Sequence, residues 1–383
     1  DVNAKQQWFP TTIRFSREYQ QNTNINQTNR FYAENFDDYD RSNGSIQKLF
    51  VDGKRLYVIQ QFDIGVVPIL QQIVQDTSGN PLQAQSDILL NKIQYPYKGK
   101  YGIGDVPESF AYYRYAKYFF DNNKNVVCRL SQDGITELSV IYGMNAFFVD
   151  KGKWFRKDLN NGIVPIGQVY TGEPTIYGVF DYFTNKYIIS LEEINRYSNP
   201  TTLSFHQDPY TLVFSETRDS TEGFECFTSY HSEGMSSLGT QLVSFKNGSL
   251  WTHDNSVFCN FFGQQYPCHI TVVLNSNMLD KKTWLTITED SNVIWECPEI
   301  TTQLDSYGTI KQQSNLITSD FVKLEGVYHA HFLRDSNSIG GLIQGDSLKG
   351  QYIVIKLKVN NPSEFVFINA VTCKSINSPL NSR

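Results

Sequence analysis

Residues 49–58, LFVDGKRLYV, carry the signal that decides the fold. Two apolar runs flank Asp52-Gly53, and an Asp-Gly pair between such runs is the strongest short-range signal of a β-hairpin. The same layout returns at 243–251, VSFKNGSLW, around Asn247-Gly248, and 147–155, FFVDKGKWF, predicts a third version. The chain is therefore expected to fold from short antiparallel hairpins.

More hairpins of the same length are predicted between these. Residues 118–130 and 177–189 each contain two apolar runs around a polar turn, and residues 211–214 open another hairpin. Regular short hairpins from 46 to 265, without a helical spacer, favour a β-propeller-like domain. The period of the repeat drifts, which leaves the number of blades open.

The two ends of the chain differ from this middle part. Residues 1–45 are polar and rich in Asn and Gln, which favours an extended arm laid over another surface. From 270 to 383, seven strand candidates have the lengths and spacing of a β-sandwich. Short helices are expected only at 64–75 and 107–117. The predicted fold class is all-β with minor α, arranged as an arm (1–45), a β-propeller-like domain (46–265) and a β-sandwich domain (270–383).

Charge and hydropathy argue against two classes of partner. The net charge is −6 with a pI of about 5.6, and no cluster of five or more basic residues occurs. A dedicated nucleic-acid surface is therefore not expected. No apolar run approaches the roughly 18 residues that a membrane helix needs, so no membrane span is expected.

The cysteines are scattered through strand-like segments and form no C-x-x-C pair. Buried free thiols are favoured over disulfides for a protein assembled in a reducing cytosol. Cys259 and Cys268 are close enough in the sequence to cross-link across a hairpin, and this alternative stays open. The six cysteines are Cys128, Cys226, Cys259, Cys268, Cys297 and Cys373.

Residue types that serve in metal and cofactor sites occur, but their spacing favours structural roles. His329 and His331 share one face of a predicted strand, yet no third or fourth ligand with matching spacing accompanies them. His253-Asp254 follows a hairpin strand and fits a turn. Gly102-Ile103-Gly104 lacks the third glycine of a dinucleotide site, and we interpret its glycines as turn positions.

Some β-propellers are glycosidases, and two features of the sequence bear on that chemistry. Residues 131–134, SQDG, begin like the Asp-box hairpin of sialidase-type propellers, but the glycine comes one residue early and no Trp follows. Carboxylate pairs such as Asp105 with Glu108, or Glu216 with Glu222, occur in almost any chain, and surface or capping roles are favoured for them. We therefore expect no enzyme activity, no cofactor and no metal.

Three stretches of the chain together resemble a known family. They are FY at 31–32 with NGSI at 43–46, LYV at 56–58 and VP at 67–68; YGIGDVPESFA at 101–111 with YFFD at 118–121 and RLSQDGI at 129–135; and FVKLEGVYHA at 321–330 with LRD at 333–335. This series resembles the tail stabilisation, or muzzle, proteins of crAss-like podoviruses. It is more distantly similar to the tail-hub DNA-stabilisation proteins of short-tailed phages.

The resemblance implies a structural component of the distal tail that closes the channel and retains packaged DNA until host contact. It implies a ring of identical copies, six-fold in preference to twelve-fold, beside neighbouring tail ring proteins, with DNA passing without specific binding. Members of the family are longer, and this chain begins at Asp1 and not at Met. A proteolytically processed product is therefore expected, with the upstream cleaved part as a further partner. Its place would be the virion tail, after assembly in the host bacterial cytoplasm.

Aromatic residues of the arm are the candidates for contacts between copies, although packing on their own domain is an equal alternative. They are Trp8, Phe9, Phe15, Tyr19, Phe31 and Tyr32. The rival function is a tail-tip receptor- or glycan-binding protein, with or without depolymerase activity. In that case Trp251, Tyr230 and Trp284 are candidates for stacking on sugar rings.

Overall fold

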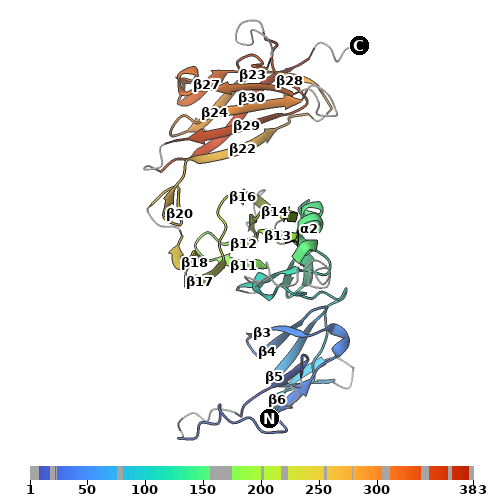
Figure 1. Cartoon of the computed structure of the whole chain (residues 1–383). Helices are drawn as coiled ribbons and strands as arrows, with labels where there is room; N and C mark the ends of the chain where they lie inside the picture. The colour runs from blue at the N-terminus through green and yellow to red at the C-terminus, as the bar shows by residue number, and fades with distance from the viewer. Residues whose placement is uncertain are drawn as a thin grey trace. The chain divides into compact units, whose positions relative to one another are not determined.

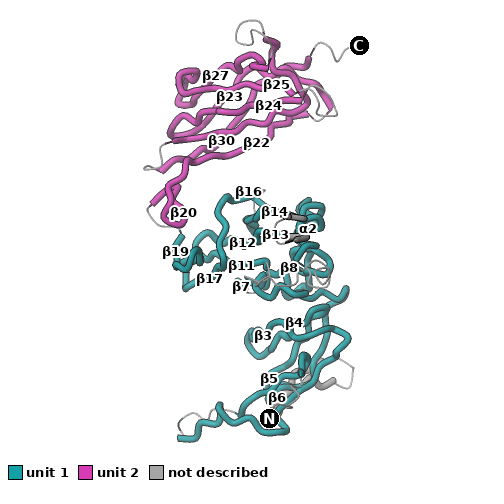
Figure 2. The backbone as a smooth tube through the Cα atoms, in the orientation of Figure 1, with its two compact units in different colours: residues 1–254 teal, residues 255–383 magenta. Residues whose placement is uncertain are grey.

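The protein folds into two compact units, residues 1–254 and 255–383, coloured teal and magenta in Figure 2. Both units consist of antiparallel β-sheets, so the all-β class with minor helix is confirmed. The computed structural model describes residues 8–17, 22, 24–75, 81–114, 116–155, 175–199, 202–216, 223–253, 257–277, 279–303, 311–337, 345–360 and 365–378. Among these residues no helix is long and apolar enough to cross a membrane.

Unit 1 begins with a short strand pair and a four-stranded meander in the order β3-β4-β5-β6 (Figure 1, blue). The bounds are β1 Thr12–Arg14, β2 Phe36–Asp38, β3 Ile46–Asp52, β4 Arg55–Gln60, β5 Ile64–Gln75 and β6 Pro81–Leu90. The strand pair is attached to the meander, because Ile13 and Tyr39 are buried in one cluster with Leu56, Val58 and Val67. These parts of residues 1–45 thus pack on their own unit.

The second and third sheets of unit 1 follow the same meander layout. One has the order β10-β9-β8-β7, and the other has the order β11-β12-β15-β16 with the hairpin β13-β14 inserted. Their bounds are β7 Ala111–Tyr113, β8 Ala116–Asp121, β9 Val126–Ser131, β10 Gly134–Glu137, β11 Ile176–Asp181, β12 Lys186–Leu191, β13 Ile194–Asn199, β14 Thr202–Gln207, β15 Tyr210–Ser215 and β16 Gly223–Thr228.

The β8–β9 and β11–β12 turns are built in the same way. Each starts with an aspartate that ends a strand and closes on an asparagine with positive φ, Asn125 at 57° and Asn185 at 58°. Asp121 accepts the backbone N–H of Asn123 at 2.9 Å, and Asp181 accepts that of Phe183 at 2.9 Å. Asparagine tolerates the left-handed conformation that such a turn requires. The two sheets therefore repeat one structural unit, although their sequences differ.

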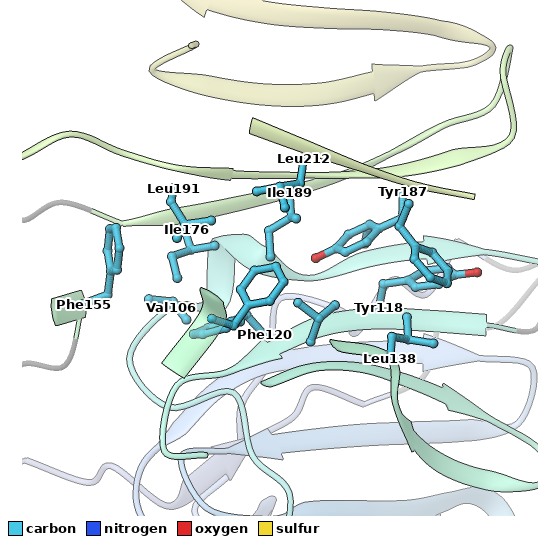
Figure 3. Packing of buried hydrophobic residues seen from close by; sticks show 14 of the residues in the cluster. Val106, Tyr118, Phe120, Leu138, Phe155, Ile176, Tyr187, Ile189, Leu191 and Leu212 are labelled. Carbon is cyan, nitrogen blue, oxygen red and sulfur yellow. The ribbon is translucent and has the colours of Figure 1, made fainter. Parts of the chain in front are cut away.

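The first strands of consecutive sheets contact one another in chain order, β7 with β11 and β11 with β17 of the three-stranded sheet β17-β18-β19. The bounds of that last sheet are β17 Gly234–Leu238, β18 Gln241–Lys246 and β19 Ser249–Thr252. Between the second and third sheets, side chains such as Tyr118, Phe120 and Ile189 point toward one another and form the largest buried core of unit 1 (Figure 3). The meanders have the form of blades, and their arrangement into a propeller stays a prediction.

Unit 2 contains two antiparallel sheets that enclose a second core. One sheet has the order β22-β29-β24-β25, and the other has β23 paired with β27, β28 and β30, with β26 beyond β27 (Figure 1). Along β29, Ile353, Ile355, Leu357 and Val359 are buried and alternate with more exposed neighbours, as one covered face requires. The bounds are β20 Asn260–Phe261, β21 Gln264–Gln265, β22 Cys268–Leu274, β23 Lys282–Ser291, β24 Glu296–Gln303, β25 Lys311–Leu316, β26 Val322–Leu324, β27 Val327–His331, β28 Lys349–Gly350, β29 Ile353–Val359 and β30 Ile368–Asn377.

Three local predictions are wrong. Residues 64–75 form strand β5, because β-branched residues and Pro68 disfavour a helix. Residues 107–117 contain a 3-10 turn, Pro107–Ser109, followed by β7 and the start of β8. Residues 147–155 form no hairpin: helix α2, Asn145–Gly152, follows α1, Leu138–Ile141, and brings Phe148 onto Phe120, with ring centroids 5.8 Å apart.

The predicted domain boundaries stay predictions. The structure divides between residues 254 and 255, and the short hairpin β20-β21 belongs to unit 2. One of the seven strand candidates in this part of the chain spans residues 293–295, and in the structure this strand is displaced along the chain. β23 extends to Ser291, residues 292–295 connect the two strands, and β24 begins at Glu296.

Candidate functional site

Unit 1 contains a cavity of about 650 Å³ at the junction of its first and second four-stranded sheets. Charged and hydrogen-bonding side chains from both sheets surround it. We call it the basic pocket, lined by Asp52, Lys54, Arg55, Tyr57, Gln71, Tyr97, Lys117, Ser131 and Gln132.

The β3–β4 turn supplies three of the four charged residues. Asp52 pairs with Arg55 across this turn, and Gly53 inside it has a φ of 59°. Glycine adopts that left-handed conformation without the steric cost that an L-residue bears. The tight turn thereby keeps Asp52, Lys54 and Arg55 at one rim of the pocket.

Lys117 of β8 brings a buried positive charge into the pocket. The residue is 4% exposed, and its Nζ donates a hydrogen bond to the carboxylate of Asp52. The same ammonium lies 4.6 Å from the ring centroid of Tyr57, where the negative face of the ring attracts a cation. A buried ammonium needs such partners, because removing an unpaired charge from water costs several kcal/mol. Lys117 thus ties the second sheet to the β3–β4 hairpin.

A pair of tyrosines forms part of the pocket lining. The side chain of Tyr97 is hydrogen-bonded to that of Tyr57. Burial raises the pKa of Tyr97, the neighbouring Tyr57 adds to this effect, and the positive charge of Arg55 acts in the opposite direction. The hydroxyl of Tyr97 therefore keeps its proton at neutral pH and can both donate and accept a hydrogen bond.

The pocket is positive although the chain is acidic. Three cations, Lys54, Arg55 and Lys117, face one carboxylate, that of Asp52, which gives a formal charge of +2 in a chain of net charge −6. In the described part of the chain, no carboxylate forms an ion pair with Lys54 or Arg55. A concave surface with low-dielectric walls concentrates the field of such charges, so the pocket attracts anions.

The sheets on either side of the pocket share a core. Tyr57 and Ile59 of β4 are buried in one cluster with Phe119, Cys128 and Leu130 of β8 and β9. This packing fixes the β3–β4 turn relative to β8 and to the β9–β10 turn. The pocket is thus built on packed strands on both sides.

Gly102 is required where the two sheets meet. A Cβ atom there would lie 2.1 Å from the carbonyl oxygen of Gln61, a distance that no real Cβ tolerates. The Gly102 N–H donates to the buried carboxylate of Asp121 at 3.2 Å, and burial raises the pKa of Asp121. Gly104 has a positive φ of 59°, which suits the turn position expected for it. Gly102 is needed for a different reason, because the backbone of Gln61 lies too close to leave room for a Cβ atom.

The predicted arm residues occupy different environments. Trp8, Phe9 and Phe31 are more than half exposed, whereas Phe15 and Tyr32 are partly buried. The guanidinium of Arg17 lies 4.4 Å from the centroid of the Tyr32 ring. Tyr19 lies outside the described residues. Their role in contacts between copies stays a prediction.

Two of the three histidines singled out from the sequence lie within hydrogen-bonding distance of a hydroxyl group. His329 Nδ1 lies 2.9 Å from Thr288 Oγ1 on the neighbouring strand, and His331 is exposed at the end of β27. His253 Nε2 lies 2.8 Å from Ser244 Oγ, and Asp254 lies outside the described residues. No group of three or more His, Cys, Asp or Glu in the described ranges is arranged to hold a metal ion.

The nominated carboxylates are engaged separately. Asp105 accepts a hydrogen bond from Gln61 at 2.9 Å, and Glu108 accepts one from Thr175 at 3.1 Å. Glu216 forms an ion pair with Arg129 at 2.7 Å. Glu222 lies outside the described residues.

The sugar-stacking candidates differ in accessibility. Trp284 is buried in the core of unit 2, and Trp251 is partly buried with its ring N–H donating to the carbonyl of Lys246 at 3.3 Å. Tyr230 packs against His253 with the two rings tilted at 46° and their centroids 5.0 Å apart. Trp284 is therefore unavailable to a ligand.

Cys259 and Cys268, the two cysteines for which a cross-link stayed open, lie next to each other in the structure. Cys268, at the start of β22, is in hydrogen-bonding contact with the thiol of Cys259, which precedes β20. Burial, followed by that contact, raises the pKa of Cys268 to about 11. All six cysteines are free thiols in the structure.

Two stretches singled out in the sequence border the basic pocket, although neither predicts the pocket itself. They are the hairpin signal at Asp52-Gly53 and the SQDG stretch at 131–134, and both hairpins contribute lining residues. The adjacent cations Lys54 and Arg55 beside a tight turn are the local signal. Lys117 and Tyr97 come from distant positions, and only packing brings them to the same cavity.

Comparison with known families places the chain in a class. Residues 257–335 match the Crassvirus muzzle protein C-terminal domain, over the region of unit 2 that runs from β20 to β27. This match indicates that the chain is a structural component of a bacteriophage tail. More particularly, it confirms the resemblance to the muzzle proteins of crAss-like phages, while the more distant similarity to tail-hub proteins of short-tailed phages stays a prediction.

Other comparisons add no functional argument. No curated protein matches the chain. Among solved structures, a sucrose-6-phosphate hydrolase from Lactobacillus gasseri is 8% identical, with 84% of this chain and 80% of that chain covered and a TM-score of 0.15. A TM-score of 0.15 supports no conclusion about fold or activity.

Proposed function

We propose that this phage tail component closes the distal tail channel and retains the packaged DNA until host contact. The observation that carries the proposal is the match of residues 257–335 to the muzzle protein C-terminal domain. Unit 2, which contains this match, is a sandwich with a continuous buried core, which suits a part that bears mechanical load and undergoes no chemistry of its own. The function is mechanical, and we propose that the chain is not an enzyme.

The functional form in this proposal is a ring of identical copies with six-fold symmetry. A closed ring needs two complementary lateral surfaces on each copy, and large apolar side chains contribute most of the binding energy at such surfaces. The exposed Trp8, Phe9 and Phe31 supply side chains of this kind. Neighbouring tail ring proteins and the upstream cleaved part of the polypeptide are the other proposed partners. DNA passes without specific binding, because an acidic chain repels phosphates.

The location is tested on purified virions. Gold-conjugated antibody against the chain is expected to mark the distal tail in negative-stain micrographs, and mass mapping of the virions is expected to find peptides of this chain. Gold on the fibres would favour receptor binding instead. Absence of both the label and the peptides from virions would overturn the assignment to the tail.

DNA retention is tested with particles that lack a functional copy of the chain. Their genome is expected to become sensitive to DNase before host contact, as measured by quantitative amplification, while particles complemented with the wild-type chain stay protected. Equal protection in both preparations would contradict the closing function. Release of sugars from capsular glycan by the purified chain would contradict the absence of enzyme activity.

A further inference from the structure

We propose that the basic pocket binds an acidic saccharide, whose carboxylate or phosphate group contacts Lys54 and Arg55. The proposal goes beyond the channel-closing function and does not depend on it. It rests on the cavity, its charge and the kind of neutral groups that line it.

The charge of the pocket selects an anion. Lys117 is already paired with Asp52, so its charge is largely satisfied inside the protein. Lys54 and Arg55 line the same cavity, and among the described residues neither is paired with a carboxylate. Arg presents a planar fork of donors that matches a carboxylate or a phosphate, and Lys adds a compact charge. Together they form a binding place for one anionic group.

The uncharged lining selects a hydroxylated ligand. Beside the ions, the pocket presents three hydroxyls, from Tyr57, Tyr97 and Ser131, and two side-chain amides, from Gln71 and Gln132. Each of these side chains can both donate and accept hydrogen bonds, as can the hydroxyl groups of a sugar. An apolar ligand would remove these polar side chains from water without offering them new hydrogen bonds, at the cost of their desolvation.

The size and construction of the pocket agree with this ligand. A volume of about 650 Å³ lies within the range of about 300 to 1,000 Å³ typical of small-molecule sites. Tyr57 and Tyr97 belong to the core that joins the two sheets, so their hydroxyls are held in place before the ligand arrives. Binding to such a preformed site loses less entropy than ordering a loose loop.

The test measures binding of defined small ligands to the full 383-residue chain by isothermal titration calorimetry. The probes are glucuronate, glucose 6-phosphate, neutral glucose, inorganic phosphate and a short Asp/Glu-rich peptide. At least one of the two acidic sugars is expected to bind at least about tenfold more tightly than glucose and than inorganic phosphate, and the stronger of the two identifies the anionic group.

The decisive variant is Lys54→Gln/Arg55→Gln, which removes the two exposed cations of the pocket and spares the buried Lys117. Its affinity for the acidic sugar is expected to fall at least about tenfold. The matched control is Arg14→Gln/Lys92→Gln, which removes one Arg and one Lys from exposed positions of unit 1 outside the pocket and is expected to bind as the wild type does.

Four results would overturn the proposal. They are binding of glucose as tight as that of the stronger acidic sugar, binding of inorganic phosphate as tight as that of the stronger acidic sugar, tighter binding of the acidic peptide than of any sugar, and equal loss of affinity in the two variants. No detectable binding of either acidic sugar would overturn it as well. All of these outcomes are separate from the DNA-retention assay, so failure of one proposal is distinguishable from failure of the other.

Discussion

Glu289 of β23 accepts a hydrogen bond from the backbone N–H of Trp295 at 3.1 Å, inside the core of the C-terminal sandwich. The residue has no exposed surface, and its other carboxylate oxygen has no hydrogen-bond partner among the described residues. Burial raises the pKa of Glu289 to about 7, and the hydrogen bond from Trp295 opposes this shift only in part. A carboxyl group that prefers to be neutral therefore lies in the core of the domain that carries the family match.

The stability of unit 2 is expected to fall as pH rises from about 4.5 to about 7. In this range the unfolded state, with the ordinary pKa of 4.5, loses the Glu289 proton while the folded state keeps it. Above pH 7 both states are ionised, and the full loss of about 3 kcal/mol has accrued. Glu289→Gln cannot ionise and is expected to abolish this pH dependence and to be the more stable form at pH 8.

Hydrogen-exchange mass spectrometry of the β23 peptide, corrected for the intrinsic exchange rate at each pH, measures this effect. The matched control is Asp290→Asn, because Asp290 is the exposed neighbour on the same strand. A pH profile that Glu289→Gln leaves unchanged would contradict the assignment of the titration to Glu289.

Lys117→Met is expected to destabilise unit 1 by about 2 kcal/mol. Methionine preserves most of the volume but leaves the partly buried carboxylate of Asp52 without its cation. Adding Asp52→Asn in the same chain is expected to recover part of the loss, because the double variant contains no unpaired charge.

Exchange protection of the β8 amides is the measurement for Lys117. Lys92→Met, at an exposed position, is the control and is expected to leave the β8 amides unchanged. If Lys117→Met/Asp52→Asn is less stable than Lys117→Met alone, the Lys117–Asp52 ion pair is not what stabilises the contact between the first and second sheets of unit 1.

Gly102→Ala is expected to lower the melting temperature of unit 1 by at least about 6 °C, which corresponds to about 3 kcal/mol. The added Cβ would overlap the backbone of Gln61 and Phe62, and backbone cannot move aside as a flexible side chain can. Differential scanning calorimetry measures the change. Gly234→Ala is the control, because its Cβ would meet only the Phe245 ring at an ordinary 3.5 Å. Equal melting of both variants would show that the two sheets do not approach as closely as described.

Cys259 and Cys268 are expected to form a disulfide when the folded chain is treated with oxidised glutathione. Exchange joins the two sulfurs and releases two molecules of reduced glutathione, and the contact between the thiols favours this pair. Mass spectrometry of non-reduced peptides detects the link. In the variant Cys259→Ser, Cys268 is expected to stay unlinked to any other cysteine of the chain. A link from Cys268 to the exposed Cys226 in the wild type would contradict the prediction.

Hairpin turns were the most predictable part of the fold. Asn247-Gly248 forms a two-residue turn between paired strands. The signal at Asp52-Gly53 also marks a two-residue turn, which consists of Gly53 and Lys54 because Asp52 still pairs with Arg55 as a strand residue. In both hairpins the local chemistry of the turn residues favours the chain reversal. Residues 147–155 show the limit of this reasoning. Their apolar runs are compatible with a strand or a helix. In the structure they form helix α2, in which Phe148 packs against Phe120 of β8.

The sequence by itself determined the all-β class, the alternation along β29 and the family resemblance, because strand period, turn chemistry and motif are local properties of the chain. Only the tertiary structure decided which distant residues meet. Lys117 lies beside Asp52, Tyr97 beside Tyr57 and the Gly102 backbone beside Gln61, and none of these pairs has a local signature. The charge of the basic pocket and the raised pKa of Glu289 depend on burial and on neighbours across sheets, which exist only once the strands have packed.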